Sequence, residues 1–146
     1  MIRPQRTLAA ALAWLSLLLL APSLVLAQQV ATGVYYDYVQ VSFGGTTRSV
    51  LVPRETDAIN QNAPLNVSIP AALRVLRDNK RATYGNTSLT LTDEDIAASR
   101  AVVHIDPAQQ MWVLIIAAEV VYTFTELGLT EVVFPSLGDE AWTRDD

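Results

Sequence analysis

The fold of this chain is decided by one apolar stretch near its C-terminus, DPAQQMWVLIIAAEVVYTFTELG at residues 106–128. Asp106 suits the cap of a helix, and Pro107 suits the first helical position, where its missing N–H is not needed. Gly128 suits the left-handed residue that commonly follows a helix end. We therefore predict one long helix over 107–127, and we expect the other elements to pack against it.

The predicted helix has two unlike faces. A transmembrane helix is untenable, because Glu119 interrupts a run that is already too short to cross a bilayer comfortably. One stripe of the helix mixes apolar and polar side chains, so either the loop or tail of the chain covers it or a partner protein does. Candidate partner-binding residues on this stripe are Trp112, Ile116 and Glu119. The remaining, apolar face suits burial and comprises Gln110, Val113, Leu114, Ala117, Val120, Val121, Phe124 and Leu127, widened by Met111, Ile115, Ala118 and Tyr122.

The N-terminal segment has the pattern of a secretory signal peptide. Arg3 and Arg6 precede an apolar run over 8–20, and small or aliphatic residues precede a cleavage site after Ala27. An uncleaved membrane anchor is the alternative, since residues 8–27 are about long enough to span a bilayer. We expect cleavage, no membrane span afterwards, and a secreted or extracytoplasmic protein of the periplasm or cell envelope.

The composition of residues 28–146 narrows the class of protein to which the chain can belong. Residues 28–146 hold eight basic and 15 acidic side chains, a net charge of −7. Such a domain is a poor non-specific partner for nucleic acid or anionic lipid. Cys is absent, which excludes disulfides, thiolate metal sites, a thiol-linked lipid anchor and a Cys nucleophile. An exported domain of this size without disulfides fits a bacterial envelope.

Local patterns predict the other elements. Gly44-Gly45 indicates a tight turn between the first two strands, and Pro53 is expected to end the second. A helix opened by Pro70 is expected over 68–79, and its inner stripe is expected to consist of Ile69, Ala72, Leu73 and Leu76. Thr92 suits the cap of a shorter helix. The predicted strands cover residues 33–43, 48–52, 88–91, 101–105 and 130–134.

These elements predict an α/β (α+β) fold: a single small domain with a mixed sheet of about five strands packed against two helices. The strands at 101–105 and 130–134 flank the long helix, so we expect them to be parallel. The domain is expected to cover residues 28–135. Residues 54–66 are expected to form a loop, and the acidic residues 136–146 a flexible tail.

A basic cluster lies on or just beyond the outer side of the helix at 68–79. It consists of Arg74, Arg77, Lys80 and Arg81. Most such clusters are a solvated helix face with favourable charge at the helix C-terminus. The alternative is an anion or partner site, which makes Arg74, Arg77 and Arg81 candidate partner-binding residues.

Residues that could carry catalysis are few. His104 is the only histidine and, on a strand, would share a face with Asp106, but no Gly-x-Ser-x-Gly sequence supplies a nucleophile. The acids Asp93–Asp95 lack the oxygen spacing and glycine of a calcium loop, and fit a helix cap better. No catalytic residue, metal or cofactor is therefore predicted. The alternative function is a small hydrolase or ligand-binding protein using His104, Asp106 and these acids.

Four segments of the chain resemble the GerMN domain, named for sporulation and germination proteins. The most specific is IAAEVVYTFTELGLTEVVF at 116–134, which is similar to the end of the family's long helix and the strand after it. Residues 51–55, 71–76 and 101–106 are similar to three earlier family segments, in the same order. The resemblance implies a small extracytoplasmic module without a recognised active site, similar in shape to ring-building domains of envelope assemblies.

The expected function is therefore a non-enzymatic module of the bacterial envelope that acts through protein–protein interaction. The resemblance does not identify the envelope protein or proteins that would be its partner. A homo-oligomer is compatible with it, and nucleic acid is not an expected partner.

Overall fold

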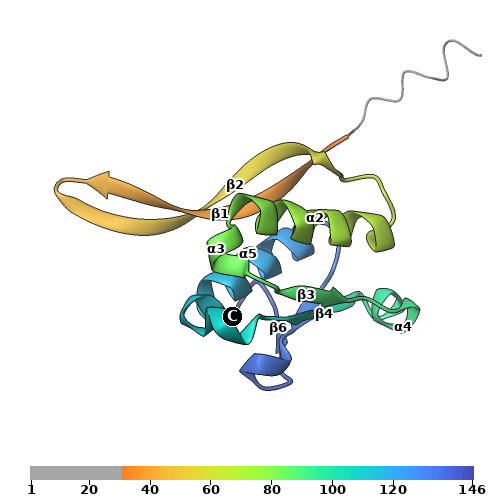
Figure 1. The fold of residues 1–146 in the computed structure, drawn as a ribbon. Helices are drawn as coiled ribbons and strands as arrows, with labels where there is room; N and C mark the ends of the chain where they lie inside the picture. The colour runs from red at the N-terminus through yellow and green to blue at the C-terminus, as the bar shows by residue number, and fades with distance from the viewer. Residues whose placement is uncertain (1–30) are drawn as a thin grey trace, which may run out of the picture. The chain divides into compact units, whose positions relative to one another are not determined.

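Two β-sheets and the helices packed against them make up residues 31–146, the part of the chain that the computed structural model describes (Figure 1). The predicted signal peptide, residues 1–27, lies outside the described residues. The α+β class and the single small domain are confirmed. The strands form a two-stranded sheet, β1-β2, and a four-stranded sheet in the order β3-β4-β5-β6, instead of one sheet of about five strands.

The first sheet is a long antiparallel hairpin. Strand β1 covers Thr32–Phe43 and β2 covers Thr46–Asn60. The predicted turn is confirmed, because Gly44 and Gly45 have φ of +59° and +80° and join strands that pair Phe43 with Thr46. Two positive φ values in a two-residue loop match the twist of the hairpin.

The expected end of the second strand at Pro53 is wrong, and so is most of the expected loop over 54–66. Strand β2 continues to Asn60, with Pro53 opposite Tyr36. The Tyr36 amide donates to Thr123 rather than across the hairpin, so Pro53 stands in a non-hydrogen-bonded pair. Its missing N–H therefore faces a free strand edge, where proline is tolerated.

The second sheet contains β3 (Ser88–Thr90), β4 (Arg100–His104), β5 (Glu131–Val133) and β6 (Ala141–Trp142). β4 and β5 are parallel, as predicted, whereas the β3-β4 and β5-β6 pairs are antiparallel. The segment 136–146, expected to be flexible, supplies β6. Its Trp142 ring packs edge-on against Phe134, with 6.2 Å between ring centroids.

Helix α2 spans Leu65–Asn79 and begins three residues before the expected start at Ser68. Pro70 lies inside the helix, where it removes one intrahelical hydrogen bond. Its predicted inner stripe is confirmed: Ile69, Ala72, Leu73 and Leu76 are all buried. The short helices are α3 (Arg81–Tyr84), α4 (Asp93–Ala97) and the 3₁₀ helix η3 (Pro135–Leu137).

The predicted long helix consists of two parts. A 3₁₀ helix, η2, covers Pro107–Trp112, and the α-helix α5 covers Val113–Glu126. The Asp106 cap is confirmed, since its carboxylate accepts from the Ala108 amide. The Gly128 stop is also confirmed: its φ is +115°, and the Gly128 and Leu129 amides bond back to the Thr125 and Phe124 carbonyls.

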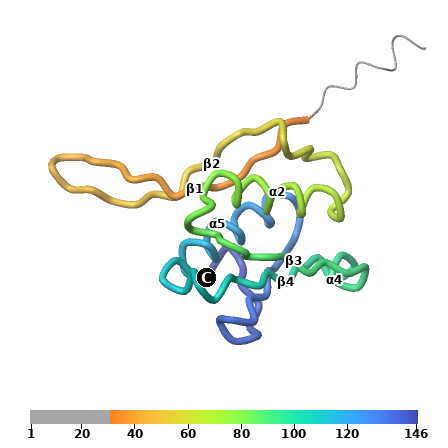
Figure 2. The backbone as a smooth tube through the Cα atoms, in the orientation of Figure 1, coloured from red at the N-terminus to blue at the C-terminus, as the bar shows by residue number. Residues whose placement is uncertain are grey.

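The expected inward face of the long helix is not buried over its whole length. Gln109 has non-helical backbone angles, so a single helical phase does not extend through the stretch. Met111 and Leu114, expected on the buried face, are 80% and 66% exposed. Helix α5 contacts β1, α2 and β5. Figure 2 shows that it lies between the four-stranded sheet on one side and the hairpin and α2 on the other.

Candidate functional site

Helix α5 closes one edge of β1 with its side chains. The Tyr38 amide donates to Glu119 Oε1 over 3.0 Å, and the Tyr36 amide donates to Thr123 Oγ1 over 2.9 Å. Both amides face away from β2. Two polar side chains of the helix thus occupy the place that a neighbouring strand would take.

The spacing of a helix and of a strand makes this closure work. Glu119 and Thr123 are four residues apart, which is a rise of about 6 Å in an α-helix. Tyr36 and Tyr38 are two residues apart, about 6.8 Å in a strand. The near match lets consecutive side chains on one stripe of α5 reach consecutive outward amides of β1.

Glu119 is also the centre of a charged cluster at the root of the hairpin. It is 0% exposed, and its Oε2 accepts from the Tyr84 hydroxyl over 2.8 Å. Lys80 Nζ contacts the carboxylates of both Glu119 and Asp37, and donates to the Tyr38 carbonyl over 3.1 Å. Each charged side chain of this cluster therefore has a partner of opposite charge, as buried charges require.

The surroundings of the cluster shift two pKa values. Burial lowers the pKa of Lys80, but its hydrogen bonds to Asp37 and Glu119 outweigh that, so the pKa lies above its ordinary value. Burial, followed by the neighbouring Glu119 carboxylate, raises the pKa of Tyr84 well above its ordinary value. The ammonium and the phenol are thus the stable forms at neutral pH. Proton transfer is not a chemistry that these shifts favour, since both groups move away from pH 7.

The sequence left open whether the chain itself or a partner covers the face at Trp112, Ile116 and Glu119, and in the structure the chain covers most of it. Ile116 and Glu119 are 0% exposed, and only Trp112 remains partly accessible. The reason is that β1 lies across this stripe of α5. Neither the polar loop nor the tail is needed to cover it. A partner could reach Trp112 but not the other two.

Beyond Tyr38 the hairpin leaves the helices and projects as an arm, which we define as residues 39–52. Figure 1 shows it extending past α2 and α3. Every residue from Gln40 to Val50 is exposed. No side chain of α5 closes the β1 edge here, since Glu119 and Thr123 serve only Tyr38 and Tyr36.

The arm has an apolar and a polar face. The register pairs Val39 with Val50 and Val41 with Arg48, and opposite residues share a face. The polar face carries Gln40, Ser42, Thr47 and Ser49, with a 3.1 Å hydrogen bond between the Ser42 and Thr47 hydroxyls. The apolar face is hollowed, and its concave surface is lined by Val41, Phe43, Gly44, Thr46, Arg48 and Val50.

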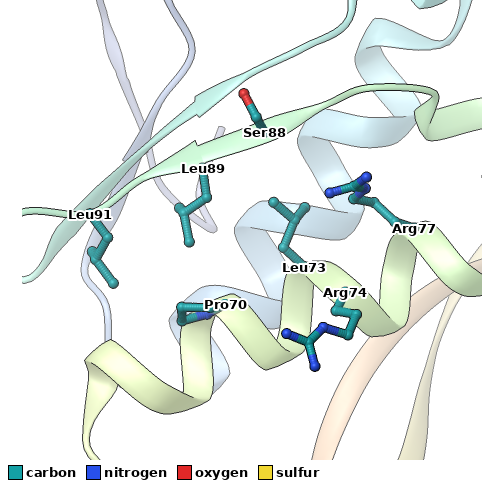
Figure 3. A pocket seen from close by; sticks show the side chains of 7 residues that line it. All are labelled: Pro70, Leu73, Arg74, Arg77, Ser88, Leu89 and Leu91. Carbon is teal, nitrogen blue, oxygen red and sulfur yellow. The ribbon is translucent and has the colours of Figure 1, made fainter.

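A second hollow of about 380 Å³ lies between α2 and β3. It contains two of the predicted basic residues, Arg74 and Arg77, which are exposed and have no ion-pair partner within residues 31–146. Figure 3 shows Leu89 and Leu91 extending toward α2 beside Leu73. We call this the α2–β3 groove.

The other members of the basic cluster lie elsewhere. Lys80 belongs to the Glu119 cluster, and Arg81 is exposed beside Asp78, with 3.6 Å between the charged atoms. The structure therefore divides the basic cluster that the sequence presented as one. Arg74 and Arg77 share the α2–β3 groove.

The residues considered for hydrolysis are not brought together. His104 is exposed on β4, and its Nε2 lies 3.1 Å from the Thr90 hydroxyl. Asp106 accepts from the Asn86 and Ala108 amides, and these hydrogen bonds lower its pKa. Asp106 thus caps η2 and links it to the loop at Asn86. No hydrogen bond joins Asp106 to His104 within the part of the chain that the structure describes.

The Asp93–Asp95 acids form the predicted helix cap. Asp95 bonds the Thr92 amide and hydroxyl, and the Thr92 hydroxyl accepts from the Asp95 amide, which is a complete capping box. Hydrogen bonds from Thr92, and then from Arg100, lower the pKa of Asp95. Among residues 31–146, no group of three or more His, Cys, Asp or Glu side chains is arranged to hold a metal ion.

Helices long and apolar enough to cross a membrane are absent from residues 31–146. Comparison of the chain with protein-family models, curated proteins and solved structures finds no match. The GerMN resemblance and the expected export remain predictions.

Sequence reasoning missed the arm and the Glu119 cluster. The alternation from Val39 to Phe43 was visible, but a local pattern does not show whether a strand packs on the domain or projects from it. The polar residues Glu119 and Thr123, four apart in an apolar helix, were also visible. Their partners on β1 were not, because they are more than 80 residues away in the chain.

Proposed function

We propose that this protein is a non-enzymatic, exported module of the bacterial envelope that binds another protein, in the manner of the GerMN domain. The observation that carries the proposal is the apolar face of the arm. Phe43 is 87% exposed at its tip, with Val41 and Val50 at 45% and 44%. Export is supported by the signal-peptide pattern of residues 1–27.

The arm has the physical features of a binding element. Covering a large apolar side chain contributes about 1.5–3 kcal/mol, so a partner that buries Phe43 and its neighbours gains free energy. The concave surface suits a rounded apolar projection, and Arg48 adds one charge at its margin. The Glu119 cluster anchors the root of the arm, which reduces the entropy lost when the arm is held in a complex.

Substitutions on the two faces of the arm test the proposal. We expect Phe43→Asp to abolish capture of the partner from bacterial envelope extract, because a buried carboxylate at the contact is costly. Ser42→Asp places the same charge one residue away on the polar face and should capture the partner as the unsubstituted protein does. The measurement is affinity capture followed by mass spectrometry, with circular dichroism of each variant to show that the fold is kept.

Equal capture by both variants would exclude the apolar face as the contact. Loss of capture in both would show that any charge on the arm is harmful, which also contradicts a contact made by one face. Trp112→Ala is a further comparison, because Trp112 is the accessible remainder of the face expected from the sequence.

A further inference from the structure

We propose that the α2–β3 groove binds an extended acidic segment of a partner protein, with its carboxylates on Arg74 and Arg77 and its backbone beside the outer edge of β3. The inference rests on the proposed role in protein binding. It uses a surface built by other elements than the arm, so the two can be tested separately.

The charge of the groove is unusual for this chain. Residues 31–146 contain eight basic side chains, and five of them, Arg54, Lys80, Arg81, Arg100 and Arg144, form ion pairs. Arg74 and Arg77 are two of the three that do not. They stand three residues apart on α2, which makes them neighbours on the helix surface. In a domain with a net charge of −7, they form a local positive site.

Guanidinium groups are suited to carboxylates in particular. Each presents a planar fork of N–H donors that matches the two oxygens of a carboxylate, and such pairs are stronger than neutral hydrogen bonds. Charge complementarity therefore favours an acidic ligand.

The floor of the groove is apolar. Pro70 and Leu73 contribute from α2, while Leu89 and Leu91 contribute from β3 and the residue after it. Figure 3 shows these four side chains between the helix and the strand, with the arginines along the α2 side. A ligand that alternates acidic and apolar side chains would satisfy both parts, and such alternation is the pattern of an extended strand.

The edge of β3 favours an extended backbone. In the order β3-β4-β5-β6, β3 is a terminal strand and pairs only with β4 among residues 31–146. Ser88 and Thr90 are exposed. Addition of a peptide strand to such an edge supplies main-chain hydrogen bonds, and the neighbouring groove supplies side-chain selectivity.

The same chemistry argues for a peptide and against an anionic membrane. A membrane would present its negative charge to a wide area of a protein that is itself acidic, and repulsion would oppose the contact. An extended peptide places its carboxylates in the groove alone.

A binding titration with a defined peptide tests the inference. The probe is a fluorescein-labelled peptide of alternating Val and Glu, eight residues long, titrated with the full chain and followed by fluorescence anisotropy. We expect saturable binding that weakens at least tenfold in Arg74→Glu and in Arg77→Glu. Arg81→Glu is the matched control, since it makes the same charge change at an exposed site outside the groove, and it should change binding less than twofold.

Two further probes examine the backbone and the charge. A peptide with Pro in place of Val keeps the carboxylates but cannot pair as a strand, and it should bind at least tenfold more weakly. A Lys-for-Glu peptide should not bind. Hydrogen exchange of the amides of Ser88–Thr90 that face away from β4 should slow on adding the Val-Glu peptide.

The overturning results are distinct. No binding of the Val-Glu peptide, or equal weakening in Arg74→Glu, Arg77→Glu and Arg81→Glu, would refute the groove. Arginine-dependent binding to phosphatidylglycerol vesicles without peptide binding would replace the peptide with a membrane. Failure of the peptide while Phe43-dependent capture persists would overturn this inference and leave the proposed function standing. Peptide binding that persists when Phe43-dependent capture fails would do the reverse.

Discussion

Glu119 accepts hydrogen bonds from three separate parts of the chain: the Tyr38 amide, the Lys80 ammonium and the Tyr84 hydroxyl. Replacing a buried ion pair with apolar residues often costs nothing, whereas removing one partner costs several kcal/mol. The value of Glu119 is therefore best understood as positional. It places the root of the arm over α5 in one register.

The Tyr84 hydroxyl provides a test of this cluster at a single atom. Tyr84→Phe leaves Glu119 Oε2 without its buried donor, so we expect a loss of about 1.5–3 kcal/mol in the free energy of unfolding at pH 7. The measurement is urea unfolding followed by circular dichroism. Tyr35→Phe is the control, because the Tyr35 hydroxyl makes no hydrogen bond within residues 31–146, and it should be close to neutral.

Tyr84→Phe should also change how the free energy of unfolding depends on pH. The folded-state pKa of Tyr84 is raised above 10.0, mainly by burial. A raised folded pKa gives stability that is fully present below the unfolded pKa and is lost as pH rises above it. The wild type should therefore lose stability above pH 10 more steeply than Tyr84→Phe, and the gap between them should narrow. A gap that stays constant from pH 7 to 11 would contradict the assignment.

At the level of single residues, the sequence correctly indicated the residues that cap helices and the residue that ends the long helix. The Thr92 cap, the Asp106 cap and the Gly128 stop all depend on hydrogen bonds within a few residues. Glu119 was recognised as polar in an apolar helix, but its burial depends on a strand far away in the chain. For this reason the sequence left open whether the chain itself or a partner covers it.

At the scale of elements, α5 occupies the position beside β1 that a neighbouring strand would otherwise take. An edge strand with free amides is open to pairing with other chains. The Glu119–Thr123 stripe closes β1 as far as Tyr38, and beyond that point the arm is open. The boundary between the closed and open edge is also the boundary between the domain body and the arm.

Thr123→Val tests this closure. Valine keeps the shape of threonine but leaves the Tyr36 amide without an acceptor, so we expect a loss of about 1–3 kcal/mol in stability. Amide hydrogen exchange at Tyr36 should accelerate, while the Tyr38 amide, which bonds Glu119, should change less.

Thr123→Ser is the matched variant, because it retains the hydroxyl while removing a methyl group. If Ser and Val variants accelerate Tyr36 exchange equally, the hydroxyl is not the acceptor that matters. The readout is residue-specific, so a general loss of stability would appear at both tyrosine amides and be recognised as such.

Strand and helix boundaries show the limit of local patterns. The first strand and its Gly-Gly turn were predicted closely because two positive φ values are a local requirement. The second strand was ended too early at Pro53. Proline stops a strand only where its missing N–H is needed, and that depends on which edge it faces.

At the scale of the whole molecule, the C-terminal segment completes the domain. β6 pairs with β5, and Arg144 lies over the rings of Tyr36 and Tyr122, at 5.5 and 5.3 Å from the ring centroids. Arg144 also pairs with Glu126, and the pKa of Arg144 is raised chiefly by that hydrogen bond. The segment thereby connects the four-stranded sheet to α5 and the hairpin.

Deletion of residues 141–146 measures what this segment contributes. The aromatic pair of Trp142 is worth about 1 kcal/mol and the two cation–π contacts of Arg144 together about 1 kcal/mol, so we expect a loss of about 2 kcal/mol. Urea unfolding checks it, with Asp139→Asn as a control at an exposed position of the same segment. A deletion that leaves stability unchanged would restore the flexible tail expected from the sequence.

The sequence by itself determined the α+β class, the parallel pairing around α5, the capping residues and the inner stripe of α2. These depend on residue periodicity and on hydrogen bonds within one turn or loop, which a local pattern records. Only the tertiary structure decided the division into two sheets, the length of β2, the burial of Ile116 and Glu119, the projection of the arm and the pairing of β6. Each of these depends on which distant segment covers a surface; the Tyr38–Glu119 contact, for instance, joins residues 81 apart in the chain.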